Sequence, residues 1–227
     1  MKKIIKKTPF LRNIASWLYF KLIVPFKEFN GSGDYWNKRY KKGGNSGDGS
    51  YDKLAEFKSE FINNFVKLNH IDSIIEIGCG DGNQLNYAKY PKYIGYDVSE
   101  EALRLCRSKF NEDKTKAFKH LNSFATDRAD LSLSLDVIYH LIEDDVFEVH
   151  MNQLFSVSDK YVIIYSSNTN QQQNLQAPHV KHRKFTEWTE RLDNWELIEI
   201  KKNKYPFDGN TEKSSFADFY VFKNTYK

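Results

Sequence analysis

A run of glycines behind an apolar segment is the first feature of the sequence that could do chemistry. Residues 74–85 read IIEIGCGDGNQL, with Gly78, Gly80 and Gly82 at alternate positions. Glycines at this spacing let the backbone turn sharply after a strand and approach a ligand without obstruction by Cβ atoms. In an open parallel sheet, ligands bind just beyond the carboxyl end of such a strand. The segment therefore predicts a small-molecule site.

A carboxylate stands at a suitable distance from this loop. Residues 93–99 read YIGYDVS, and Asp97 follows the glycines by about 20 residues, the spacing expected for an acid that binds ribose hydroxyls. Two alternatives stay open: the acid only caps the next helix, or the glycines form a turn that binds no nucleotide. Together the two features favour a ligand that contains a nucleoside.

The residues around the glycines separate two kinds of cofactor. A dinucleotide favours G-x-G-x-x-G, with its pyrophosphate at a helix N-terminus, whereas this chain has E-x-G-x-G-x-G. Glu76 and Asp81 add negative charge, which repels a pyrophosphate and attracts a ligand with an ammonium and a sulfonium group. The pattern favours S-adenosylmethionine. A nicotinamide-dependent oxidoreductase is the alternative, supported only by the shared layout of strand, glycines and acid.

The elements that must position these residues alternate between strand-like and helical patterns, as in a doubly wound α/β sheet. Strands are predicted at 73–78, 92–97, 117–121, 129–135, 160–167, 195–202 and 216–222. Helices are predicted at 54–68, 84–88, 100–109, 143–155 and 186–192.

Three segments in this order resemble the successive motifs of the class I S-adenosylmethionine-dependent methyltransferases: IIEIGCGDGNQL, YIGYDVS, and SLDVIYHL at 134–141. The resemblance covers residues 70–167. It implies a mostly parallel, Rossmann-like seven-stranded sheet whose last strand is antiparallel, with residues 193–206 and 214–223 as a plausible final pair.

The resemblance also implies a role for individual residues in binding the cofactor. Gly78, Gly80 and Gly82 would line its methionine and ribose portions, Glu76 would fix the loop, and Asp97 would hold the ribose. Further contacts are expected from Cys79, Asp81, Gln84, Val98, Asn122, Ser123, Phe124, Leu135 and Asp136. Val98 would flank the adenine, residues 122–124 would contact the edge of the adenine, and residues 135–136 would lie near the sulfonium. Phe124 could equally be a core residue.

The N-terminal region is expected to form a separate unit, residues 1–50, ahead of a domain at 51–227. Apolar residues at 10, 11, 14, 17, 18 and 22 predict an amphipathic helix over residues 8–24. Residues 31–50 hold six of the eleven glycines and predict a loop, either an ordered lid near a ligand or a flexible linker. Its DYWNKRY stretch resembles the part of many small-molecule members that packs over the cofactor and neutralises its carboxylate, with Tyr35, Arg39 and Tyr40 as contacts. Residues 43–51, GGNSGDGSY, resemble a flap of some bacterial members associated with surface glycans.

Histidines and an arginine follow the later strands, where an acceptor would bind. Methyl transfer from a sulfonium needs mainly positioning and desolvation, but His140 could take a proton from a hydroxyl acceptor, the alternative being a packing role. His179, His182 and Arg183 could converge on an anionic acceptor, the alternative being a solvated basic loop. The remaining histidines are assigned no role, with His150 expected on a helix surface.

Composition and missing motifs limit the other readings. With 34 basic and 30 acidic side chains, the net charge of +4 does not imply nucleic acid. No metal-ligand spacing, serine-hydrolase elbow or phosphate-binding Walker loop is present. Two cysteines and an N-terminal apolar run too short to span a membrane favour a reduced, cytoplasmic protein. The N-terminal helix would pack on its own domain or a second copy, or contact a membrane surface weakly.

The sequence thus predicts an O-methyltransferase for a small polar or anionic acceptor, such as a sugar, phosphate or phosphoramidate group of a surface polysaccharide. A macromolecule-directed methyltransferase or a binding module is the other alternative. The N-P-P-Y motif of amine methylation does not follow the fourth predicted strand.

Overall fold

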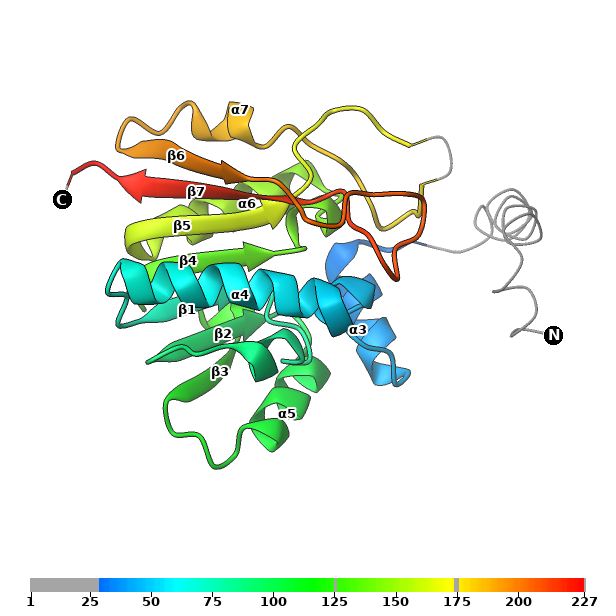
Figure 1. Cartoon of the computed structure of the whole chain (residues 1–227). Coiled ribbons are helices and arrows are strands. Elements are labelled where there is room, and N and C mark those ends of the chain that lie inside the picture. The colour runs from blue at the N-terminus through cyan, green and yellow to red at the C-terminus, as the bar shows by residue number, and fades with distance from the viewer. Residues whose placement is uncertain (1–28, 125, 174–175, 227) are drawn as a thin grey trace.

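The computed structural model describes residues 29–124, 126–173 and 176–226, which form one seven-stranded sheet with helices on both faces (Figure 1). The strands lie in the order β3-β2-β1-β4-β5-β7-β6. β7 pairs antiparallel with β5 and β6, and all other pairs are parallel. The predicted doubly wound, mostly parallel sheet is therefore confirmed. The strands are β1 Ile74–Ile77, β2 Tyr93–Asp97, β3 Lys116–His120, β4 Ala129–Leu135, β5 Ser158–Ser166, β6 Trp195–Lys201 and β7 Asp218–Asn224.

Three helices agree closely with the sequence pattern: α4 Asp52–Leu68, α5 Glu100–Lys109 and α6 Asp144–Ser156. The others, α3 Ser32–Lys41 and α7 Thr186–Thr189, differ from it. Short 3₁₀ turns are η3 Asp48–Ser50, η4 Gln84–Tyr87, η5 Leu121–Ser123 and η6 Ile138–His140. The predicted helix at 84–88 is thus a 3₁₀ turn, and the one at 186–192 is shorter than expected. The predicted helix at 8–24 lies outside the described residues.

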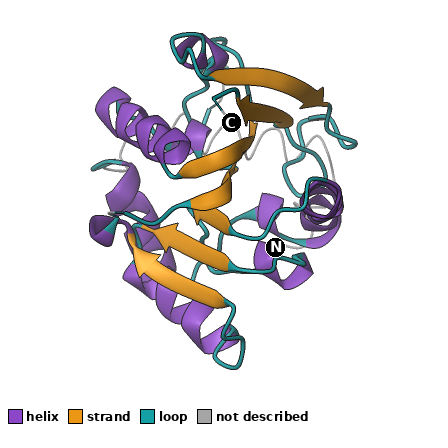
Figure 2. Ribbon diagram, turned by 90° about the vertical axis from the view of Figure 1, so that its left-hand side faces the viewer, coloured by secondary structure: helices purple, strands orange, loops and turns teal. Residues whose placement is uncertain are grey.

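The sheet separates two apolar cores. On one face, α4 and α5 pack on alternate strand residues such as Leu131 and Ile163. On the other face, α6 and α7 pack on the remaining residues, such as Ile75 and Val162. Figure 2 shows helices on both sides of the sheet. Burial of each large apolar side chain contributes about 1.5–3 kcal/mol, and this fixes the register at which the motifs reach the sheet edge.

Residues 32–41 form a helix, which corrects the predicted loop. Five of the six glycines at 31–50 lie outside this segment, and those that flank it, Gly31 and Gly43, have φ values of 105° and 74°. Inside it, Asp34 lies in the first turn and pairs with Lys38 at 2.7 Å, while basic residues occupy the last turn. This charge order suits the helix dipole and stabilises the short helix.

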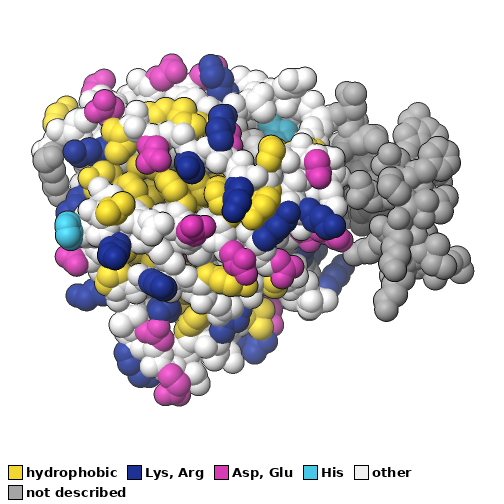
Figure 3. Space-filling view, in the orientation of Figure 1, with side chains coloured by type: hydrophobic (Ala, Val, Ile, Leu, Met, Phe, Trp, Pro, Cys, Tyr) yellow, Lys and Arg dark blue, Asp and Glu magenta, His cyan; other side chains and the backbone are white. Residues whose placement is uncertain are grey.

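The surface of the described residues carries both signs of charge. Figure 3 shows basic and acidic side chains intermingled over the face on which α4 lies. No helix among residues 29–124, 126–173 and 176–226 is long and apolar enough to span a membrane.

Candidate functional site

A cavity of about 380 Å³ opens at the carboxyl ends of β1, β2 and β4. Its size lies within the usual range for small-molecule sites, roughly 300–1,000 Å³. The predicted catalytic residue His140 lines it, as do ten of the predicted cofactor contacts: Tyr40, Glu76, Gly78, Cys79, Gly80, Gln84, Asp97, Val98, Leu135 and Asp136. The site therefore stands where the glycine motif and the strand ends predicted it.

The glycine loop requires glycine because other parts of the chain approach it. Gly78 and Gly80 have φ values of 93° and 57°, which side chains rarely adopt. A Cβ atom on Gly80 would lie 2.3 Å from Oγ of Ser46, and one on Gly78 would lie 2.5 Å from Cγ2 of Val137. Gly82 packs against Cys106 instead and does not line the cavity.

Asp97 is held at the tip of β2 by backbone amides. Its Oδ2 accepts a hydrogen bond from N–H of Gly80 at 2.9 Å, and its Oδ1 accepts one from Ser99 at 2.8 Å. Burial raises the pKa of the Asp97 carboxyl, although these amide bonds oppose the shift. Each carboxylate oxygen retains a lone pair, so the group could still accept hydrogen bonds from two neighbouring hydroxyls.

Glu76 lies under the same loop, in the middle of β1. Its Oε2 accepts a hydrogen bond from the hydroxyl of Tyr93 at 2.6 Å. Burial raises the pKa of Glu76 to about 7, because no solvent reaches the carboxyl to stabilise its charge. Glu76 therefore ties β1 to β2 and adds only part of a negative charge to the cavity at neutral pH.

Asp81 joins the lid to the glycine loop and does not line the cavity. Its carboxylate accepts hydrogen bonds from N–H of Ser46 at 3.1 Å and from the hydroxyl of Tyr51 at 2.8 Å. In return, Ser46 Oγ accepts N–H of Asp81 at 3.0 Å and bonds the hydroxyl of Tyr40 at 2.9 Å. The charge expected beside the ligand thus serves to hold residues 46–51 over the loop.

Two predicted lid contacts point elsewhere. The Arg39 guanidinium donates to the backbone oxygen of Asn45 at 2.6 Å and to its side chain at 3.2 Å. The Tyr35 ring stacks on His179, with ring centroids 4.2 Å apart. Neither residue lines the first cavity, so the structure does not place them against the expected cofactor carboxylate.

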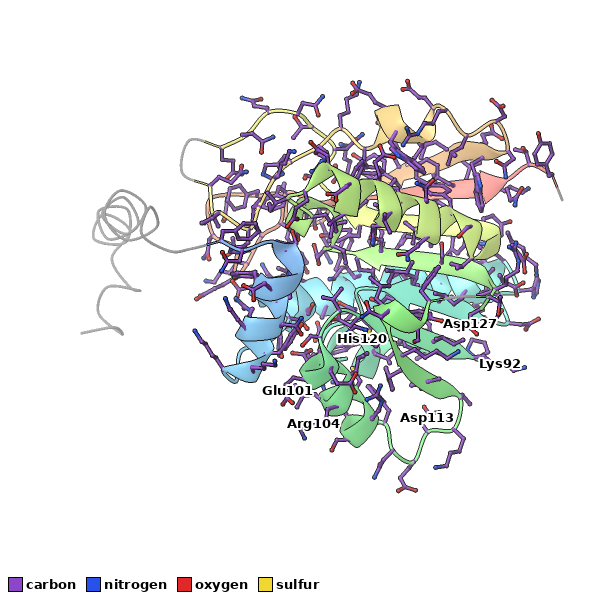
Figure 4. The ribbon with its side chains drawn as sticks, turned by 180° about the vertical axis from the view of Figure 1, so that it is seen from behind. Lys92, Glu101, Arg104, Asp113, His120 and Asp127 are labelled. Carbon is purple, nitrogen blue, oxygen red and sulfur yellow. The ribbon has the colours of Figure 1, made fainter. Side chains whose placement is uncertain are left out.

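The predicted adenine-edge residues also lie outside the cavity. η5 folds Asn122 and Ser123 back onto His120, whose ring nitrogen accepts N–H of Asn122 at 3.1 Å. His120 lies at the end of β3 (Figure 4). Phe124 packs on Tyr96, with ring centroids 5.0 Å apart. Leu121, one residue earlier, lines the cavity in their place.

A second cavity of about 260 Å³ adjoins the first. Trp36, Ser46, Asp136 and His140 line both. Two molecules, one bound in each cavity, would therefore meet beside these four side chains. His179 and Arg39 line the second cavity only.

His140 stands on this shared wall in a neutral state. Its Nδ1 lies 2.8 Å from the backbone oxygen of His179, which can only accept, so Nδ1 carries the hydrogen. Burial lowers the pKa of His140 to about 4. Nε2 is then an unprotonated acceptor with no hydrogen-bond partner among the described side chains. Trp36 packs edge-on against the ring, with centroids 5.0 Å apart.

The expected convergence of His179, His182 and Arg183 is wrong. Only His179 reaches a cavity. His182 is buried against Ser167, whose Oγ lies 2.7 Å from Nδ1. Arg183 donates to the backbone oxygens of residues 141 and 142 and to Asp144 at 2.7 Å. Its guanidinium thus fixes the loop before α6 and is not free to grip an acceptor.

Two buried residues with ionisable side chains line the cavity and were missed from the sequence. Lys58 of α4 reaches the cavity, with Nζ 2.5 Å from Oδ2 of Asp136. His150, predicted on a helix surface, is buried and lies 2.9 Å from Oγ of Ser134. The available signal for Lys58 was its position on the apolar stripe of α4, four residues after Leu54 and four before Ile62.

Comparisons with known proteins agree with this geometry. Residues 75–154 match the family model described as a methyltransferase domain. No curated protein sequence matches the chain. One similar structure is the N-methyltransferase NodS from Bradyrhizobium japonicum WM9 with S-adenosyl-L-homocysteine, at a TM-score of 0.62 and 12% identity, over 86% of this chain and 99% of that one.

Two further structures share the fold. Magnesium protoporphyrin IX methyltransferase from Synechocystis PCC 6803 with bound S-adenosylhomocysteine has a TM-score of 0.58 at 13% identity, over 94% of this chain and 99% of that one. The methyltransferase domain of bacterial CtHen1 has a TM-score of 0.59 at 17% identity, over 76% of this chain and 99% of that one. All three structures are less than 25% identical to this chain, so the likeness concerns the fold alone.

The cavity fits the cofactor of this fold. Gly78 and Gly80 lack Cβ atoms, the Asp97 carboxyl is fixed in place by backbone amides, and the carboxylates of the lining suit a cationic sulfonium. The domain match over residues 75–154 and the seven-stranded Rossmann-like fold support an S-adenosylmethionine-dependent methyltransferase.

Proposed function

We propose that the protein methylates an oxygen atom of a small polar or anionic acceptor bound in the second cavity. The observation that carries this proposal is the wall that the two cavities share, because the acceptor oxygen must meet the methyl group between them. His140 is the neutral base on that wall. Sugars, phosphates and phosphoramidates of surface glycans are the acceptors that we retain.

His140 would take the proton of a hydroxyl acceptor. When bound, the cofactor supplies an electrophilic methyl group, whose bond to sulfur breaks as the acceptor oxygen attacks. The oxygen becomes more acidic during the attack, and the free Nε2 of His140 accepts its proton. The carbonyl of His179 holds the imidazole in the required tautomer at 2.8 Å. An acceptor that is already an anion would need orientation but no base.

The lining of the second cavity supports a polar acceptor. Thr211, Ser214 and Ser215 contribute hydroxyls on one side, and Arg39 is the one Lys or Arg side chain among its described lining residues. Tyr139 and Phe216 present ring surfaces that would exclude water from the acceptor. A small molecule with an apolar face and several oxygen atoms matches this lining of the second cavity.

The lining of the first cavity supports roles for further residues in binding the cofactor. We propose that Asp97 holds the ribose hydroxyls, that Gly78 and Gly80 face the methionine portion, and that Val98 and Leu121 flank the adenine. Each of these residues lines the first cavity. A cytoplasmic location, and packing or weak membrane contact by the N-terminal helix, remain proposals from the sequence.

A product analysis tests the proposal. Purified protein is incubated with S-adenosylmethionine carrying an isotope-labelled methyl group and a panel of sugars, sugar phosphates and phosphoramidates, and the labelled atom is located by mass spectrometry and NMR. We expect O-methylation. Transfer to nitrogen or carbon would contradict the acceptor assignment.

Two matched variants separate the role of His140 from general effects. His140→Asn should lower turnover of a hydroxyl acceptor by about 100-fold, the usual scale of general-base catalysis. His70→Asn, at an exposed helix end with φ 50°, should leave turnover unchanged. Full activity in His140→Asn would remove the base from the mechanism.

A further inference from the structure

Lys58 is the single Lys or Arg among the described residues that line the first cavity. Its side chain is 1% exposed, and its Nζ lies 2.5 Å from Oδ2 of Asp136. The ring of Tyr165 lies under the ammonium, with its centroid 5.3 Å from Nζ. A buried lysine in a site for a cationic ligand needs an explanation, because like charges repel.

The same cavity holds carboxyl groups that would attract a cation. The three that are not exposed belong to Glu76, Asp97 and Asp136, and the exposed Asp145 is a fourth acidic lining residue. Asp136 has a φ of 60°, and the hydroxyl of Tyr139 donates to its Oδ1 at 2.7 Å. The two oxygens of Asp136 are thus held separately by Tyr139 and Lys58. This carboxylate stands on the wall between the cavities, where the sulfonium and the acceptor would meet.

The reaction changes the charge in this cavity. S-adenosylmethionine carries a sulfonium cation, whereas its product, S-adenosylhomocysteine, has a neutral sulfur. A cavity that favours the cation strongly stabilises the reactant more than the transition state, in which the charge is leaving sulfur. Preferential binding of the cation therefore raises the barrier to methyl transfer and does not increase the rate.

We propose that Lys58 sets the preference of the cavity between the charged cofactor and its neutral product by offsetting the carboxylate of Asp136. The proposal rests on the cofactor and not on the acceptor, so it can fail while O-methylation stands. Lys58 acts through Asp136 and is therefore a positioning residue.

A purely structural role for the pair predicts a different outcome. In that case Lys58 and Asp136 only fasten α4 to the end of β4, and loss of either partner weakens binding of both ligands alike. An electrostatic role predicts opposite changes in selectivity for the two variants. The ratio of the two dissociation constants separates these cases, because it cancels general effects on the fold.

The test is calorimetric titration of the full chain with S-adenosylmethionine and with S-adenosylhomocysteine, at about pH 8, where a lone carboxylate is ionised. Lys58→Met leaves Asp136 unpaired and should shift selectivity about tenfold toward S-adenosylmethionine. Asp136→Asn leaves Lys58 unpaired and should shift selectivity about tenfold the other way. The double variant should return the ratio to within about threefold of the wild-type value.

Lys67→Met is the matched control, since it removes an exposed lysine from the last turn of the same helix. It should leave the ratio unchanged. If Lys58→Met does not fold, Asp136→Asn and the double variant still show in which direction the pair changes the ratio of the two dissociation constants. Shifts in the same direction for both single variants, or a ratio equal to that of the wild type, would overturn the proposal.

Discussion

Acid should destabilise the fold through His150. This residue is 4% exposed and lies beside Ser134 under the cavity. Burial lowers the pKa of His150 to about 4, whereas an unfolded histidine has a pKa of about 6.5. Below pH 6.5 the unfolded chain therefore binds a proton that the folded chain does not. The stability contributed by neutral burial is present above that pH and is lost as the pH falls toward 4.

The size of the effect follows from this gap. One pKa unit corresponds to about 1.4 kcal/mol, so at pH 5 the loss from His150 should be roughly 2 kcal/mol. His140 shifts in the same direction, and burial raises the pKa of Glu76 to about 7, which acts in the opposite direction. The wild-type curve alone therefore sums several groups, and a variant is needed to isolate His150.

Urea unfolding of wild type and His150→Asn, followed by circular dichroism between about pH 7.5 and pH 5, supplies that comparison. The free energy of unfolding should fall by about 2 kcal/mol more in the wild type than in the variant. His70→Asn, which changes an exposed histidine, should follow the wild type. Parallel curves for wild type and His150→Asn would refute the reasoning, because they would mean that the imidazole is equally protonated in the folded and unfolded chains.

Three further outcomes are expected. Gly80→Ala places a Cβ atom 2.3 Å from Oγ of Ser46 and should weaken S-adenosylhomocysteine binding by at least about tenfold in calorimetry. Gly43→Ala has a similar φ but no atom within 4 Å, so equal losses in both variants would point to backbone strain alone. Glu76→Gln should remove the contribution of this carboxyl, which is lost as pH rises from about 4.5 through 7, so the melting temperature should rise more steeply with pH in the variant than in the wild type. Asp81→Ala removes the acceptor of N–H of Ser46, and unchanged hydrogen exchange at that amide would show that this bond does not hold the lid.

Regular elements were predictable where a single periodicity dominates. The bounds of β4 and α5 agree with the sequence pattern, because alternating apolar and polar residues in β4 and a helical apolar stripe in α5 specify them locally. The glycine loop and Asp97 followed from spacing along the chain. The helix at Ser32–Lys41 was missed because glycines on both sides made the whole segment resemble a loop.

Partners distant in sequence were not predictable. Arg183 has the right chemistry for an anion, but its guanidinium meets backbone oxygens 41 and 42 residues earlier in the chain. No sequence motif marks Lys58 as a site residue, since only the packing of α4 brings its side chain to Asp136. Asn122 and Ser123 have suitable side chains, yet η5 turns them onto His120. Residue type indicated the chemistry, and the tertiary fold decided where it is used.

The central claim is that the crevice beside the glycine loop holds the adenosyl cofactor. A crystal structure of the protein with S-adenosylhomocysteine tests this most directly. We predict that the ligand lies along Gly78 and Gly80, with both ribose hydroxyls within hydrogen-bonding distance of the Asp97 carboxylate. A ligand bound elsewhere, or a crevice that stays closed by side chains at saturating ligand, would contradict the account.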